Sequence, residues 1–369
     1  MKKFLAAALA AFSAVTIVAD DSSSAIVRLL NSRASGSAKT FAEAALAVAR
    51  DAAAGKPLQQ YVIAVVADDR SFPASAKPTD AMRKEYLDKS RGKIVALAER
   101  KNNPLAWYLL SLEKNDLVML RRAADGGNPQ ALNAWGTFTL SEALSNPGVK
   151  TNDVDRILEK SFGYFKRAAS MKDLNGLYNL GMCYMRGYGV ERNENMAFDC
   201  FRTSAEMGHP EAINNIGGFF RDGIVVGRNP ATATKWFKKS ADLGNAYGEL
   251  NYALALQRGE GIEKDEKKAV EMFSSAARRG NPEAMNAYAM CLYNGSGVEK
   301  DLRAAVQWYR HSASFGFPPA MDNLAVCYER GDGVAKDMIR STVWKVRARA
   351  ARGDRNAAAW LAQNGHSLR

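Results

Sequence analysis

Residues 280–316 read GNPEAMNAYAMCLYNGSGVEKDLRAAVQWYRHSASFG, and this stretch contains one complete structural unit. A proline-initiated apolar run leads to the pair Gly295 and Gly297, and a second apolar run ends at Gly316. Glycine accepts the left-handed backbone at which helices end, and proline suits the first turn of a helix. The stretch therefore predicts two helices joined by a short loop.

The same pattern recurs along the chain in one phase. Its leading loop glycines stand 36 residues apart, at Gly187, Gly223, Gly259, Gly295 and Gly331. In four of these five units another glycine follows two residues later, and Val225 replaces it in the remaining unit. Sequence periods of about 20 to 50 residues are typical of solenoids, in which stacked units share a core. We therefore expect a stack of helix pairs.

A polar residue follows each leading glycine by six positions. These residues are Asn193, Asn229, Asp265, Asp301 and Asp337. Side-chain oxygens of Asn and Asp accept hydrogen bonds from the free amides at a helix start. This column predicts the N-caps of the second helices.

Apolar residues recur at helical spacing after these caps. The predicted core stripe comprises Ala197, Ala233, Ala269 and Ala305, then Trp236, Met272, Trp308 and Trp344, with Phe201, Phe237, Phe273 and Tyr309 beside them. A stripe at this spacing indicates the buried face of an amphipathic helix.

The combined pattern Ala…Leu-Gly…Tyr…Gly-x-Gly-Val…Asp…Ala…Trp-Tyr/Phe…Ala…Gly resembles the Sel1-like repeat family, which is related to tetratricopeptide repeats. The resemblance is closest over residues 174–352, and it can be followed back through Phe165 to Gly127. It implies an all-α fold, a right-handed superhelical α/α solenoid of 36-residue helix-turn-helix repeats. It also implies a concave surface that binds peptides or protein segments.

The first hundred residues depart from this consensus. Residues 1–19 pair Met1-Lys2-Lys3 with an apolar run over residues 4–18, which predicts a signal peptide cleaved after Ala19, or alternatively after Ala25. The run is shorter than the roughly 20 residues of a membrane span. We expect an exported protein, periplasmic or extracellular, with no integral membrane span. Residues 20–100 form an off-consensus helical region, with a helix from Thr79 or Asp80 to Arg100, and residues 101–369 form the solenoid.

The chain is basic, with a formal net charge of +12. Its Lys and Arg residues are scattered, with neither a dense basic run nor a nucleic-acid-binding motif. This distribution argues against nucleic acid as a partner and favours acidic partners.

A helical wheel of the first helix suggests which residues line a binding groove. In the unit that begins at Ala212, Asn215, Phe219 and Asp222 point away from the apolar side. The equivalent candidates are Asn179, Asn215, Asn251 and Asn323, followed seven residues later by Arg186, Asp222, Arg258 and Arg330. One interpretation is a groove for an extended acidic segment, with Asn amides on its main chain and Arg on its carboxylates. In the other, Asn bonds neighbouring helices and Arg complements helix dipoles.

The four cysteines are Cys183, Cys200, Cys291 and Cys327. Cys183 and Cys200 lie on either side of one loop, so a disulfide across that helix pair is one hypothesis. The wheel places Cys183 on the groove side and Cys200 on the core stripe, which argues against the bridge, because a disulfide needs Cα atoms about 4 to 7 Å apart. Buried free thiols are therefore the default expectation.

Catalytic and metal-binding patterns are not found in the sequence. His209, His311 and His366 lie in different units without metal-ligand spacing, and His209 takes a structural position after a unit-closing glycine. The Gly-x-Gly pairs follow helices, which makes them turns and not phosphate-binding loops. We expect neither an enzyme nor a bound cofactor or metal.

Two functions remain. The first is a protein-protein interaction scaffold or adaptor. The alternative, suggested by the link of some family members to cell-wall material, is recognition of envelope carbohydrate (peptidoglycan) or weak hydrolysis of a β-lactam or peptidoglycan. Glycoside hydrolysis would require two carboxyl groups about 5 to 9.5 Å apart. No carboxylate spacing in the sequence predicts such a pair. The identity of the partner and the oligomeric state are not encoded in these patterns.

Overall fold

The computed structural model describes residues 45, 47–49, 52, 57–66, 77–145 and 151–365. Every regular element in these residues is a helix, so the described part of the chain is all-α as predicted. The chain divides into two compact units, Met1–Ile216 and Gly217–Arg369. The predicted signal peptide, the residues around Asn146-Pro147-Gly148, and His366 lie outside the described residues.

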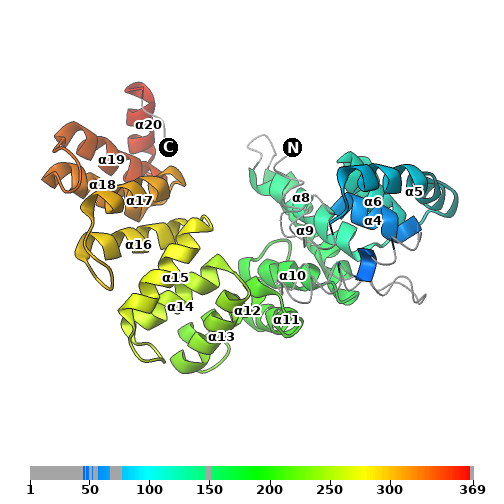
Figure 1. Ribbon diagram of the computed structural model, residues 1–369, viewed down its shortest axis with the longest axis horizontal. Coiled ribbons are helices and arrows are strands. Elements are labelled where there is room, and N and C mark those ends of the chain that lie inside the picture. Colours follow the sequence, from blue (N-terminus) through cyan, green and yellow to red (C-terminus); the bar gives the residue numbers. More distant parts are fainter. Residues whose placement is uncertain are drawn as a thin grey trace. The chain divides into compact units, whose positions relative to one another are not determined.

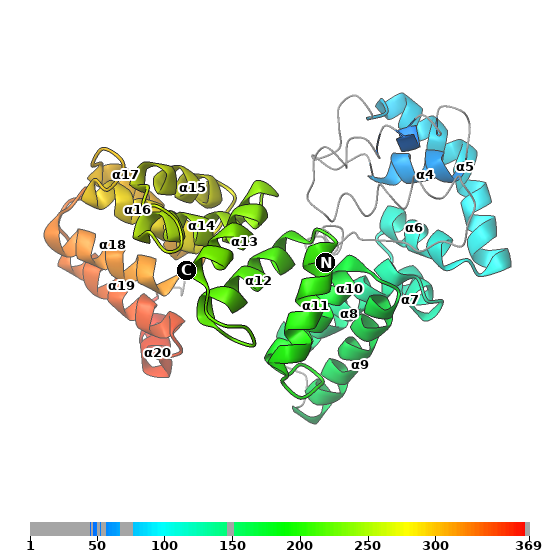
Figure 2. The same cartoon turned by 90° about the horizontal axis from the view of Figure 1, so that it is seen from below.

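Within each unit, helices that follow one another in the sequence pack against each other (Figures 1 and 2). The first unit contains α4 (Pro57–Val66), α5 (Asp80–Lys101), α6 (Pro104–Lys114), α7 (Leu117–Asp125), α8 (Pro129–Ser145), α9 (Thr151–Ser170), α10 (Leu174–Arg186) and α11 (Glu194–Glu206). The division between the units falls within α12 (Pro210–Asp222). The second unit contains α13 (Pro230–Asp242), α14 (Ala246–Arg258), α15 (Glu266–Arg278), α16 (Pro282–Asn294), α17 (Leu302–Ser314), α18 (Pro318–Arg330), α19 (Met338–Ala351) and α20 (Arg355–Gln363).

The helix boundaries agree with the signals in the sequence. Thr79 caps α5 by accepting a hydrogen bond from the Met82 amide at 3.2 Å. All five predicted caps accept a hydrogen bond from the amide three residues further on, as Asp301 does from Ala304 at 2.9 Å. The leading loop glycines have positive φ, from 70° at Gly259 to 84° at Gly331. The predicted N-caps and helix ends are therefore confirmed.

The second glycine of each loop makes a close backbone contact. A Cβ on Gly333 would lie 2.2 Å from the Leu302 carbonyl oxygen, and one on Gly297 would lie 2.4 Å from that of Glu266. Leu302 and Glu266 begin the second helix of the preceding repeat. Only glycine permits this approach, so the loops that contain the second glycine pack their bare backbone against the previous helix pair.

The core stripe is confirmed for two of its three columns. The Ala column is buried, and so are Phe201, Phe237, Phe273 and Tyr309. The Trp and Met column is only half-buried, which corrects the prediction. Trp308 packs its edge against the ring of Tyr288, with centroids 5.5 Å apart, and lies at the border between two core clusters.

Val225 occupies the second glycine position of its loop, so a substitution there measures the backbone strain of a left-handed residue. Its φ of 65° places a β-branched residue in the left-handed region, which costs about 1 to 2 kcal/mol. We expect Val225→Gly to stabilise the protein, by at most about 1 kcal/mol, because the flexibility of glycine in the unfolded chain offsets part of the gain. The measurement is the urea unfolding midpoint.

The reverse change at the equivalent position is the matched control. In Gly261→Val the new Cβ would lie 2.4 Å from the Ala231 amide nitrogen, so this variant should unfold at clearly lower urea concentration. A Val225→Gly midpoint at or below that of the wild type would contradict the strain argument.

Candidate binding surface on the first helices

The first helix of each repeat exposes one narrow face in the second unit. On α14 this face carries Tyr247, Asn251, Leu254 and Arg258, a spacing of three to four residues that places them on one side of the helix. The equivalent positions of α16 and α18 are likewise exposed or half-buried. This face, here called the first-helix face, is the candidate site.

An apolar row runs along the first-helix face. It consists of Leu254, Met290 and Val326, which occupy the same position of three consecutive repeats. Met290 is 45% exposed, and the other two are half-buried. The predicted groove did not include this row, because only polar columns were taken as candidates. In the two preceding repeats the same column contains Met182 and Gly218, so it has no polar residue in any of the five repeats.

The predicted Asn column connects neighbouring first helices. Asn179 donates through Nδ2 to the Asn133 side-chain oxygen at 2.8 Å, and Asn323 donates in the same way to Asn286 at 2.9 Å. Asn251 accepts a hydrogen bond from Arg221 at 3.3 Å. The Nδ2 of Asn215 lies 4.0 Å from the Met182 sulfur.

All four Asn side chains are half-buried and engaged with another side chain. This arrangement supports the interpretation of helix-to-helix bonding.

The predicted charged column is more exposed. Arg186, Arg258 and Arg330 all lie at the surface, and the closest carboxylate to Arg258 is Glu260 at 3.9 Å. Asp222 is engaged by its neighbour Arg221 through two hydrogen bonds of 2.7 and 2.9 Å, and this pairing lowers the pKa of Asp222. In the second unit Arg258 and Arg330 border the apolar row with exposed cationic groups; Arg330 is also hydrogen-bonded to Tyr293, whose hydroxyl bonds Asp332.

The helical-wheel prediction was wrong about the column of the first helices that contains Phe219. Phe219, which it placed on the groove side, is only 4% exposed, and Cys183, Cys291 and Cys327 in the same column are buried. The first helix packs against its own second helix and against the next first helix, so its buried arc is wider than the wheel assumed. The amide of Gln257, on the preceding first helix, lies 3.8 Å from the Cys291 sulfur.

Cys183 and Cys200 belong to one buried cluster with Phe165 and Leu180, which corrects the expectation that the two thiols face different sides. The structure has all four cysteines as free thiols. Burial raises the pKa of Cys183 to about 12 and that of Cys200 to about 11, which keeps both thiols protonated and unreactive near neutral pH.

His209 has a structural role, as expected. Its Nδ1 accepts a hydrogen bond from the Ala212 amide at 3.3 Å, and its Nε2 donates to the Asn175 side-chain oxygen at 2.9 Å. The ring stacks on Tyr178 with centroids 4.5 Å apart. It thus caps α12 as Asn245 caps α14.

Burial lowers the pKa of His209 to about 3, despite the carboxylate of Glu211 3.2 Å away. The imidazole ring is therefore neutral near neutral pH, and both of its nitrogens are engaged in hydrogen bonds.

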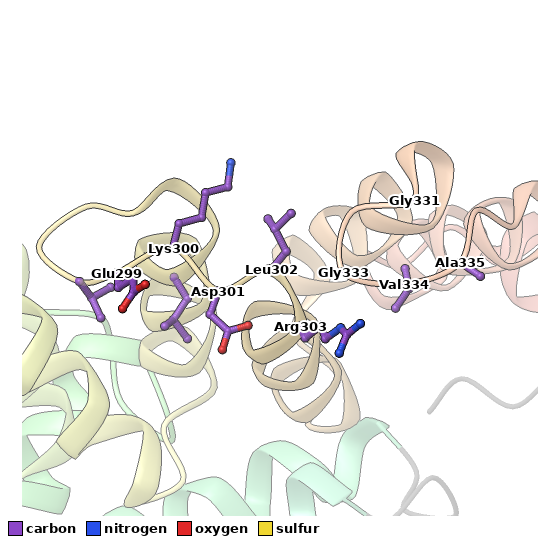
Figure 3. A pocket seen from close by; sticks show the side chains of 11 residues that line it. Glu299, Lys300, Asp301, Leu302, Arg303, Gly331, Gly333, Val334 and Ala335 are labelled. Carbon is purple, nitrogen blue, oxygen red and sulfur yellow. The ribbon is translucent and has the colours of Figure 1, made fainter.

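An open pocket of about 1110 Å³ lies between two consecutive Gly-x-Gly loops of the second unit. Glu299, Lys300, Asp301 and Arg303 line one side, and the backbone around Gly333 lines the other (Figure 3). Asp301 already caps α17, and the charged side chains do not converge on one point in the view of Figure 3. The pocket follows from the stacking of two loops, and we assign it no function.

Two features of the described residues bear on other functions. No group of three or more His, Cys, Asp or Glu side chains in this part of the chain is placed to hold a metal ion. Among the described helices, none has the length and apolar character that a membrane crossing requires.

The fold and the exposed face define an α-helical repeat protein with a candidate interaction surface. The Sel1 repeat family matches six segments, residues 149–173, 174–209, 210–245, 246–281, 282–314 and 318–344, which together make up just over half of the chain. The chain therefore belongs to the Sel1 repeat family, and its first matched segment begins earlier than the region of closest resemblance in the sequence pattern.

Two solved structures with a Sel1 or SLR fold agree with this assignment, and a third is similar over a shorter part of the chain. A Sel1 repeat protein from Oxalobacter formigenes is 26% identical with a TM-score of 0.52, and the match covers 68% of this chain and 93% of that one. The protein c5321, a protective antigen of uropathogenic Escherichia coli strains with an SLR fold, is 25% identical with a TM-score of 0.53, covering 86% and 66%. An immunity protein of Pseudomonas aeruginosa, Pa5087, is 19% identical with a TM-score of 0.43, covering 60% and 83%. No curated protein matches the chain.

The buried His209 predicts a pH dependence of stability. Its pKa is about 3 in the folded protein and near 6.5 in the unfolded chain, so below pH 6.5 only the unfolded chain binds the proton. Stability should be constant above about pH 7 and should fall by about 2 kcal/mol at pH 5 from this residue alone. The measurement is the urea midpoint at both pH values.

His209→Asn is the matched variant, because Asn245 and Asn281 cap the equivalent helices. It should have a smaller loss of stability between pH 7 and pH 5 than the wild type, whatever its stability at pH 7. Equal losses in the two proteins would show that His209 is not the source.

Proposed function

We propose that this Sel1 repeat protein is an interaction scaffold or adaptor that binds a protein segment on the first-helix face of its second unit. The observation that carries the proposal is the apolar row at the same position of three consecutive repeats, in which Met290 is exposed and Leu254 and Val326 are half-buried. Apolar side chains gathered on a surface and bordered by polar ones mark interaction sites. Sel1 repeats mediate protein interactions, which supports the same conclusion.

The partner is acidic in this proposal. Arg258 and Arg330 border the apolar row, and the whole chain carries a formal charge of +12. Such a field favours association with acidic surfaces and speeds their encounter. Binding, in this proposal, needs neither a cofactor nor a metal, and the protein is not an enzyme.

The site of action is the periplasm or the cell exterior. The support is the sequence of residues 1–19, in which Lys2 and Lys3 precede an apolar run and Ala19 marks the cut. The similar protein c5321 is described as a protective antigen, a description with which an exported location is compatible.

Site-specific photo-crosslinking tests the binding face. A photoreactive amino acid at position 290 should form an adduct with one discrete protein in the cells of origin, whereas the same amino acid at position 267 should not. Lys267 is exposed on the second helix α15 and is therefore a surface control. The double change Arg258→Glu with Arg330→Glu should strongly reduce the adduct at position 290.

Two results would contradict the proposal. One is the absence of any adduct at position 290 under conditions in which the protein is folded and exported. The other is the same set of adducts at positions 290 and 267, which would indicate random collision. Cell fractionation tests the proposed location separately. The cleaved form of the protein should accumulate outside the cytoplasm.

A further inference from the structure

The engagement of the Asn side chains bears on the shape of the partner. An extended segment needs donors and acceptors for its main chain, and the Asn column was the predicted source. In the structure Asn323 is bonded to Asn286, and Asn251 is bonded to Arg221. An extended segment covering this face would find part of the bonding capacity of these amides already used, and each main-chain group left buried and unpaired would cost about 1 to 3 kcal/mol.

A helical segment does not have this difficulty. Its main-chain groups bond one another, so it requires only an apolar surface and a suitable charge beside it. The apolar row provides the surface, and Met290 at its centre has a flexible side chain that adapts to different shapes. Arg258 and Arg330 provide the charge.

The spacing of the repeats also suits a helix. Consecutive first helices touch through the side-chain pairs Asn323 with Asn286 and Gln257 with Cys291, which corresponds to a separation of their axes on the order of 10 Å. Seven residues of an α-helix span about 10 Å. A partner helix that lies across α14, α16 and α18 would therefore place one side chain on each member of the apolar row, and successive contacting side chains would be seven residues apart.

We propose that the apolar row binds an acidic amphipathic α-helix of the partner protein, about 15 residues long. Its apolar residues recur at seven-residue intervals against Leu254, Met290 and Val326, and its acidic residues lie on the flank toward Arg258 and Arg330. This inference rests on the proposed function of the first-helix face. It replaces the extended acidic segment expected from the sequence, because the amides that would hold such a segment are engaged.

Synthetic peptides test the inference directly. The probe is a fluorescein-labelled 18-residue peptide with Leu at positions 3, 7, 10, 14 and 17 and Glu on one flank of the resulting helix. A peptide of the same composition with shuffled positions and a version with Gln in place of Glu are the peptide controls. Fluorescence anisotropy gives affinity, and far-ultraviolet circular dichroism gives the helix content of the bound peptide.

The probe should bind the wild-type protein at least about tenfold more tightly than the shuffled peptide and should gain helix on binding. Met290→Glu should weaken binding by about tenfold or more, and so should the double change Arg258→Glu with Arg330→Glu. Lys267→Glu, a charge reversal on the second helix, should leave affinity unchanged. The Gln peptide should bind more weakly and with less dependence on salt.

Several results would overturn the inference. These are equal binding of probe and shuffled peptide, no gain of helix on binding, or tighter binding of a proline-containing extended peptide with the same residues. If these results appear while position 290 still crosslinks to one discrete protein, the binding face is correct and the helical partner is wrong. If the crosslink is also absent, the proposed function fails with it.

Discussion

The close contact between each Gly-x-Gly loop and the preceding helix pair is the constraint on which the second unit depends. At Gly297 and Gly333 there is no room for a Cβ, so the loop backbone lies directly on the first turn of the previous second helix. Such a contact fixes the position of one repeat on the next within narrow limits, because neither side has a side chain that could adjust. Equivalent positions of successive first helices therefore line up, and a column in the sequence becomes a row on the surface.

This alignment explains how different columns of one helix take different roles. The Ala and Phe columns of the second helices fill the core between layers. The Asn column of the first helices bonds one repeat to the next, as Asn323 does to Asn286, and so uses part of the bonding capacity that an extended ligand would need. The neighbouring column is apolar. Met290 at its centre contacts the Asn286 amide through its sulfur, yet 45% of the residue stays exposed. Because this column is partly exposed, its apolar side chains are available to a partner protein.

The sequence predicted the features that depend on local chemistry. Caps such as Asp301 and positive-φ glycines such as Gly331 follow from hydrogen bonding and backbone sterics within a few residues, and the structure confirms them. The wheel failed at Phe219 and Cys291 because burial there is decided by the next repeat, which a wheel of one helix does not contain. The apolar row could have been found from the sequence, since the column from Met182 to Val326 contains no polar residue, but only by asking which columns of the exposed face are apolar.

The central claim is that binding takes place on aligned first helices. Hydrogen exchange of the full chain, measured with and without the acidic amphipathic peptide, tests it most directly, because it reports on every helix at once. The account predicts slower exchange in α14, α16 and α18 on binding, with little change in α15 and α17. Protection confined to the second helices or to the first unit would contradict it.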